Sequence, residues 1–154
     1  MRRVALAIVL AACCAAPAAA GPLACTVSAT GIAFTLNYDV FNATQYTITA
    51  TVIVNCNKNN VPFTLSLDAG ANSASLPNRF MKRSGGTDLL QYNMYTNVGH
   101  STVLGDGTAG TITIAGNAPN SGVNANTSIY GLLIGGQDQR AGSYSDTVNV
   151  TVTY

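Results

Sequence analysis

The chain has 154 residues, of which 7 are Lys or Arg and 6 are acidic, and its formal net charge is +1. A surface with so few cations cannot supply the phosphate contacts that dominate nucleic-acid binding, so nucleic acid is excluded as a partner. Sparse charge also leaves little electrostatic protection against self-association, which suits a protein that is built into an assembly.

Residues 1–20 have the composition of a secretory signal, because two arginines precede an apolar run and an alanine-rich segment ends at Ala20. Cleavage is expected between Ala20 and Gly21, which leaves one folded domain, residues 21–154. The apolar run has about half of the roughly 20 residues that a membrane-spanning helix needs, and no later run is longer. The protein is therefore predicted to be exported, with no transmembrane segment in the mature chain.

A second processing site competes with this one. Residues 10–13 resemble the lipobox of bacterial lipoproteins, in which the cysteine, here Cys13, is lipidated. That alternative would make the protein an outer-membrane lipoprotein. The segment that follows ends in an equally good ordinary cleavage site at Ala20, and this ordinary site is the preferred prediction.

Two cysteines, Cys25 and Cys56, remain after cleavage at Ala20. Disulfides form and persist in the oxidising compartments to which export leads, so a bond between these cysteines is predicted. Closing a loop of about 31 residues in this way stabilises a fold by roughly 3 to 4 kcal/mol. Two buried free thiols are the alternative.

The mature chain is rich in residue types that favour strands and turns, and no long segment has the 3.6-residue period of a helix. The clearest strand is 46–56, where apolar side chains alternate with threonines. A second alternating strand, 63–67, follows the polar turn 57–60. Because a short polar turn separates two alternating strands, the sequence predicts a hairpin.

Further strands are expected around Tyr92 and Met94, over residues 111–114 and over residues 129–134. The chain finishes on a strict alternation over residues 147–154. An alternating strand has one face to bury and edges to pair, so this one lies inside a sheet or leaves an edge open for a partner. Short strands at this spacing favour an all-β sandwich of two sheets.

The mature chain offers few groups suited to catalysis or metal binding. Its one histidine, His100, lies in a loop-like segment with no second histidine to complete a metal site. Asp88, Asp106, Asp138 and Asp146 have turn residues as neighbours, and an aspartate in a turn usually caps its own backbone. The protein is therefore predicted not to be an enzyme, with no catalytic residues, no metal site and no cofactor.

Several short segments point to one family. The most specific are Tyr130-Gly131, Gly136-Gln137, Ala141-Gly142-Ser143-Tyr144-Ser145-Asp146-Thr147-Val148 and the terminal Val150-Thr151-Val152-Thr153-Tyr154. Earlier segments agree in order: Cys25-Thr26-Val27-Ser28, Val54-Asn55-Cys56, Leu67-Asp68-Ala69-Gly70, Tyr92-Asn93-Met94-Tyr95 and Gly105-Asp106-Gly107. Over essentially its whole mature length, the chain resembles the spore coat protein U domain family.

Members of this family are similar to subunits of archaic chaperone-usher pili, in which the subunit is an immunoglobulin-like β-sandwich that lacks its last strand. The resemblance implies a structural or adhesive pilus subunit at the cell surface, acting in attachment or biofilm formation. It implies three partners: a periplasmic chaperone that first fills the groove, an outer-membrane usher, and neighbouring pilus subunits whose N-terminal extension then replaces the chaperone. The protein would pass through the periplasm on its way to the fimbrium.

The resemblance also implies which residues meet these partners. The expected chaperone-contact edge consists of Val148, Val150, Val152 and Tyr154. The two cysteines match the positions that the family joins by a disulfide.

The segment before the first cysteine departs from the pilus pattern, which places a longer alternating donor strand there. Only four residues, 21–24, lie between the expected cleavage site and Cys25, and one of them is proline. Proline has no N–H to donate, so this segment cannot form a donor strand. A subunit that accepts a strand without donating one is expected at the tip of a fibre. The alternatives are a self-contained secreted coat or matrix protein and a lipid-anchored envelope protein.

What a tip would bind is left open by the sequence. Leu89, Leu90, Val98 and Val103 are apolar residues in expected loops. They are interpreted first as ordinary loop packing and second as an adhesive surface.

Overall fold

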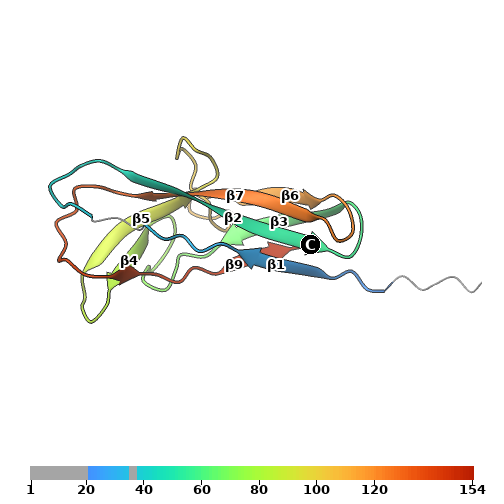
Figure 1. Cartoon of the computed structure of the whole chain (residues 1–154), viewed down its shortest axis with the longest axis horizontal. Helices are drawn as coiled ribbons and strands as arrows, with labels where there is room; N and C mark the ends of the chain where they lie inside the picture. The colour runs from blue at the N-terminus through green and yellow to red at the C-terminus, as the bar shows by residue number, and fades with distance from the viewer. Residues whose placement is uncertain (1–20, 35–37) are drawn as a thin grey trace, which may run out of the picture.

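The computed structural model describes residues 21–34 and 38–154, which form an elongated β-sandwich (Figure 1). The two-sheet architecture expected from the sequence is confirmed. Within the described ranges, no helix has the length and apolar character needed to cross a membrane. The expected signal, its last residue Ala20 and the alternative lipidation site Cys13 lie outside the described residues.

The described residues form nine strands, and all paired strands run antiparallel. One sheet has six strands in the order β1 (Cys25–Ala29), β2 (Tyr46–Cys56), β7 (Asn124–Leu133), β5 (Leu89–Tyr95), β4 (Arg79–Arg83) and β8 (Tyr144–Ser145). The other has three strands in the order β6 (Ile114–Ala118), β3 (Val61–Leu67) and β9 (Val150–Thr153). The last two strands, β8 and β9, are thus edge strands of different sheets.

The core lies between the sheets, because successive side chains of a strand point to opposite faces and only one face of each central strand is buried. In β2 and β3 the buried side chains are Ala50, Val52, Val54, Cys56, Val61, Phe63, Leu65 and Leu67. Burying one such leucine fully stabilises the fold by about 1.5 to 3 kcal/mol. The alternation over 46–56 therefore marks the central strand that it predicted.

The predicted hairpin of β2 and β3 is wrong, because the two strands lie in different sheets. Each end of their connection pairs with a different sheet. The Asn57 N–H donates to the Ala24 carbonyl next to β1 (3.0 Å), and the Asn60 N–H donates to the Pro119 carbonyl next to β6 (3.1 Å). The two apolar faces therefore meet across the sandwich, which an alternating pattern allows as readily as pairing side by side.

The strands expected around Tyr92 and over residues 129–134 are confirmed as β5 and β7. The strand expected over residues 111–114 is displaced, since β6 begins only at Ile114. Ile112 instead makes an isolated bridge to Leu104. Ile112 is 44% exposed, so the sequence misplaced the start of the sheet pairing.

Strand β4 was not expected from the sequence, because three of its five residues are cations. One of them, Arg79, is fully buried at 0% exposure. Its guanidinium donates to the carbonyls of Asp68 and Leu104 and to Oδ1 of Asn93, at distances of 2.7 to 3.0 Å. Burial lowers the pKa of Arg79, and the hydrogen bonds offset the cost of removing the charge from water. Arg79 thereby joins β4 and β5 to the residue that follows β3.

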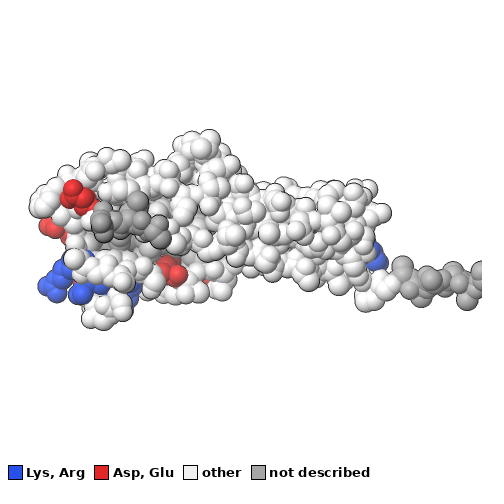
Figure 2. Space-filling model, viewed as in Figure 1, with Lys and Arg blue, Asp and Glu red and all other residues white. Residues whose placement is uncertain are grey.

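Charged side chains on the face shown in Figure 2 gather at the end of the molecule that holds β4 and β5. There the Asp88 carboxylate lies 2.6 Å from Nε of Arg83 and 3.8 Å from Nε of Arg140. Most of the remaining length of this face is uncharged.

Candidate strand-binding groove

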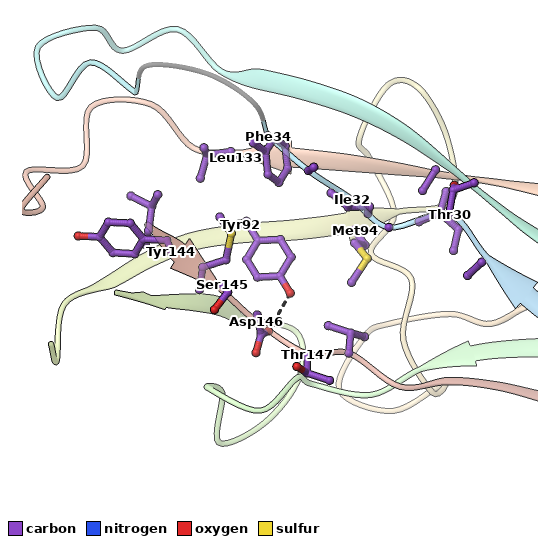
Figure 3. A pocket seen from close by; sticks show the side chains of 18 of the residues that line it. Thr30, Ile32, Phe34, Tyr92, Met94, Leu133, Tyr144, Ser145, Asp146 and Thr147 are labelled. Atoms are coloured by element: carbon purple, nitrogen blue, oxygen red, sulfur yellow. Dashed lines mark hydrogen bonds between the residues drawn. The ribbon is translucent and has the colours of Figure 1, made fainter. Parts of the chain in front are cut away.

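One side of the sandwich opens into a groove of about 920 Å³ (Figure 3). One wall is formed by residues 29–34, which continue from β1, and the other by residues 142–148 together with Val150. The floor consists of Ala50, Val52, Leu67, Met81, Leu90, Tyr92, Met94, Ile129 and Leu133. All of these except Met81 are buried, and Met81 packs against the buried cluster, so the groove opens onto the hydrophobic core.

The outer edge of β9 has no neighbour among the described strands. In an antiparallel ladder, residues alternate between turning their backbone groups toward the neighbouring strand and away from it. The Asp68 N–H donates to the Asn149 carbonyl (3.3 Å), so Asn149 and Thr151 face β3. The N–H and C=O groups of Val150 and Val152 consequently point out of the sheet.

The opposite wall begins at β1, an edge strand of the six-stranded sheet. The Thr30 N–H donates to the Thr51 carbonyl (3.0 Å), so the same alternation turns the backbone groups of Val27 and Ala29 away from β2. Ala29 lines the groove. Val27 lies on the same face of β1 and is 42% exposed, which is unusual for a core-facing valine.

Of the four residues expected to contact a chaperone, Val148 and Val150 line this groove, whereas Val152 and Tyr154 are not part of its lining. Val148, Val150 and Val152 are half-buried and pack against the core, and Tyr154, just beyond β9, is 50% exposed. The side chains of the three valines face the core, and no described strand pairs with the outer edge of β9. Contact with a chaperone at these residues stays a prediction.

Between β8 and β9 the chain passes from one sheet to the other, and Asp146 stands at this switch. Its Oδ1 accepts hydrogen bonds from the backbone N–H (3.2 Å) and Nδ2 (2.9 Å) of Asn72, and its Oδ2 accepts one from the Tyr92 hydroxyl (2.8 Å; Figure 3). Burial, together with the hydrogen bond to Asp146, raises the pKa of Tyr92, so the hydroxyl remains a donor.

The start of β9 is held by Asp68, which directly follows β3. Oδ1 of Asp68 accepts from the Asn149 N–H (3.0 Å), and Oδ2 accepts from Asn149 Nδ2 (2.5 Å). Burial acts to raise the pKa of Asp68, but the hydrogen bonds from Asn149 and from the Gly70 N–H outweigh it and hold the pKa below its ordinary value. β9 is thus anchored firmly on the side of β3.

The predicted Cys25–Cys56 disulfide is confirmed, and it joins directly opposite residues of β1 and β2, whose Cα atoms are 4.1 Å apart. The neighbouring Asn57 side chain accepts the Ala24 N–H on Oδ1 (3.0 Å) and donates from Nδ2 to the Pro22 carbonyl (2.9 Å). The disulfide and Asn57 together hold β1 and the residues before it against β2.

The four aspartates considered in the sequence analysis, Asp88, Asp106, Asp138 and Asp146, do not come together in one site. Asp88 accepts a hydrogen bond from Arg83, Asp138 is exposed, and Asp106 accepts from the N–H and hydroxyl of Thr108 as a turn residue. The hydrogen bonds from Thr108 lower the pKa of Asp106. Of the four, Asp146 alone lines the groove.

His100, Leu89, Val98 and Val103 are absent from the groove lining, whereas Leu90 belongs to its floor. His100 packs edge-on against Tyr95, with ring centroids 5.2 Å apart. Leu90 belongs to the core at 4% exposure, and Val98 is 75% exposed. Leu89 and Leu90 are thus strand residues of β5, and the expectation that placed them in a loop is wrong.

Sequence reasoning found the β9 wall of the groove and missed the opposite wall and the floor. In the wall of residues 29–34, Ile32 and Phe34 alternate with Gly31 and Ala33, and both larger side chains pack against the core. This short alternation was the available signal. It is weak because glycine and alanine also occur in turns and loops.

The comparisons with known proteins bear on the family and the fold. A model of the spore coat protein U domain matches residues 10–151. No match is found among curated proteins. Among solved structures, a chain of the CsuC-CsuE chaperone-tip adhesion subunit pre-assembly complex, from the archaic chaperone-usher Csu pili of Acinetobacter baumannii, is similar with a TM-score of 0.57 at 24% identity.

That alignment covers 86% of this chain and 40% of the other, so the chain spans less than half the length of this structural relative. The minor tip subunit HdaB of the E. coli Hda pilus gives a TM-score of 0.44 at 13% identity, over 82% of this chain and 79% of that one, and is too distant to support an argument. The likeness to the Csu complex confirms the immunoglobulin-like sandwich expected from the sequence. Because the domain model matches nearly the whole chain, the protein belongs to the spore coat protein U domain family.

Proposed function

We propose that the protein is a structural, non-catalytic subunit of a bacterial cell-surface pilus assembled by a chaperone-usher system. The observation that carries this proposal is the groove beside the unpaired edge of β9, whose floor is the hydrophobic core. An added strand would bond to the outward backbone groups of Val150 and Val152 and cover the apolar floor at the same time. It would become the fourth strand of the three-stranded sheet.

The partners follow from this mechanism. The Csu structure to which the fold is similar contains a chaperone bound to a tip adhesion subunit. By this likeness, a periplasmic chaperone fills the groove of the present protein first, and a neighbouring pilus subunit, delivered at an outer-membrane usher, replaces it. The protein is thereby exported through the periplasm to the cell surface.

We further propose a place at the tip of the fibre, with a role in attachment or biofilm formation. A donor strand must leave its own subunit, whereas Pro22 and Ala24 are hydrogen-bonded to Asn57. Cleavage after Ala20 leaves only four residues before Cys25, which supports a subunit that accepts without donating. Mass spectrometry of the exported protein would separate cleavage at Ala20 from lipidation at Cys13.

The test of strand addition is co-purification with the candidate chaperone from the periplasm, using two variants at one position. Val150→Pro removes an N–H that points out of the sheet and leaves the ladder to β3 intact, and proline is tolerated on edge strands. Val150→Ala keeps that N–H and is the matched control. We expect Val150→Ala to stay bound and Val150→Pro to lose the chaperone.

If Val150→Pro retained the chaperone as fully as Val150→Ala, strand addition along β9 would be ruled out. A wild-type protein that is a stable monomer without any partner would instead indicate a self-contained coat or matrix protein. The thermal stability of each purified form, with and without chaperone, distinguishes these outcomes.

A further inference from the structure

The groove lining is apolar or neutral with one exception. Among the described residues that line it, Asp146 is the only charged side chain. It lies on the C-terminal wall, opposite residues 29–34, and its carboxylate points toward Tyr92 of the floor (Figure 3). An incoming strand therefore passes over a carboxylate as well as over apolar side chains.

The donors that hold Asp146 within the protein are all neutral. They are the backbone and side-chain amides of Asn72 and the hydroxyl of Tyr92, which supply three hydrogen bonds. A carboxylate can accept about four hydrogen bonds, so one acceptor position on Oδ2 is left. The ion pairs among the described residues are those of Asp88 with Arg83 and Arg140, so no described cation offsets the charge of Asp146 by direct contact.

Asp146 lines the open groove and is only half-buried, so its side chain keeps partial access to water there. A strand that fills the groove removes this access to water, and burying a carboxylate with an unused acceptor is unfavourable unless a new donor takes the place of water. A purely apolar strand face supplies no such donor. We infer that the strand that occupies the groove carries one side-chain hydrogen-bond donor, a hydroxyl, amide or ammonium group, opposite Asp146 within an otherwise apolar face.

This inference rests on the proposed function and names the chemistry of the partner strand. The probe is a synthetic peptide in which valines alternate with threonines, so that one face is apolar. In a peptide series, each groove-facing valine is replaced in turn by threonine, which has nearly the same shape. Competition with the chaperone, measured on the purified chaperone complex of the full mature chain, gives the relative affinity of each peptide.

At one position we expect threonine to bind about tenfold more tightly than valine, because a hydrogen bond to a charged group outweighs the lost methyl burial. At the other groove-facing positions threonine should weaken binding. Replacing an outward-facing threonine by valine is the peptide control and should change little.

Two protein variants shift this preference in opposite directions. Asp146→Asn removes the charge and keeps the shape, so the advantage of threonine should fall to about threefold or less. Tyr92→Phe removes one internal donor to Oδ2, so the advantage should grow. A role of Asp146 limited to holding the fold would not alter the ranking of the peptides.

If every peptide competes and none of the threonine positions is favoured, the inference is refuted while strand addition stands. If a favoured position exists but is unchanged in both variants, the donor does not meet Asp146 and the inference is also refuted. If no peptide competes and the free protein is a stable monomer, both the proposed function and the inference fail.

Discussion

Removing the disulfide should weaken the fold by an amount that the structure allows us to work out. The Cys25–Cys56 bond spans a sequence separation of 31 residues. For a loop of that length the chain-entropy relation gives about 3.7 kcal/mol, a factor of about 500 in the folding equilibrium. Its loss would also loosen β1, which leads into the wall of residues 29–34 and would then be held only by its ladder to β2 and by Asn57.

The perturbation is the double variant Cys25→Ala/Cys56→Ala, which avoids leaving a buried hydroxyl or thiol at a position that is 1% exposed. Urea unfolding is followed by circular dichroism with a strand peptide at one fixed concentration, since ligand shifts apparent stability. With a slope of about 1 to 3 kcal/mol per molar urea, the midpoint should fall by about 1 to 4 M.

Dithiothreitol should lower the wild-type midpoint by a similar amount and leave the double variant unchanged. A double variant that unfolds within about 0.3 M of the wild type would refute the reasoning. Such a result would mean that the disulfide does not restrict the unfolded chain, or that the ladder to β2 is enough to hold β1.

Three further outcomes are expected. Arg79→Lys should lower the free energy of unfolding by about 3 kcal/mol or more, because lysine cannot satisfy all the buried acceptors that now bond the guanidinium. Arg140→Lys, at the surface, is the control and should cost almost nothing in the same urea titration. The pKa of Asp68 is lowered, so its contribution to stability is present above pH ~4 and is lost as the pH falls below that value; unfolding between pH 5 and pH 2 should show this loss in the wild type and a shallower one in Asp68→Asn. Gly116→Ala places a Cβ 2.2 Å from a buried phenylalanine ring and should cost about 1 to 3 kcal/mol, whereas Gly31→Ala meets nothing within 4 Å and should leave the thermal midpoint nearly unchanged.

The sequence predicted the strands whose alternation is strict, and it predicted their partners poorly. The pattern over 46–56 and 147–154 states which face of each strand is buried, because the side-chain period of a strand is two residues. It does not state which strand lies alongside, so the pairing of β2 with β7 and the assignment of β3 to the other sheet could not be derived from it.

The groove was predictable in part for the same reason. The alternating terminal valines predict an edge strand with one apolar face. The opposite wall depends on two side chains, Ile32 and Phe34, that stand between small residues. The roles of Arg79 and Asp146 could not be predicted from a local sequence pattern. Their placement depends on acceptors and donors that come from distant segments, such as Asn93 and Asn72.

The orientation of the strands has a mechanical consequence for a protein within a fibre. β2, β7 and the terminal strand run roughly along the long axis of the sandwich (Figure 1), and the hydrogen bonds of an antiparallel ladder lie perpendicular to its strands. A tensile load applied along that axis would shear the bonds between β9 and β3 together rather than opening them one after another. The chain forms the short strand β8, which pairs with β4, before it reaches β9, which pairs with β3. The load would therefore be shared by both sheets.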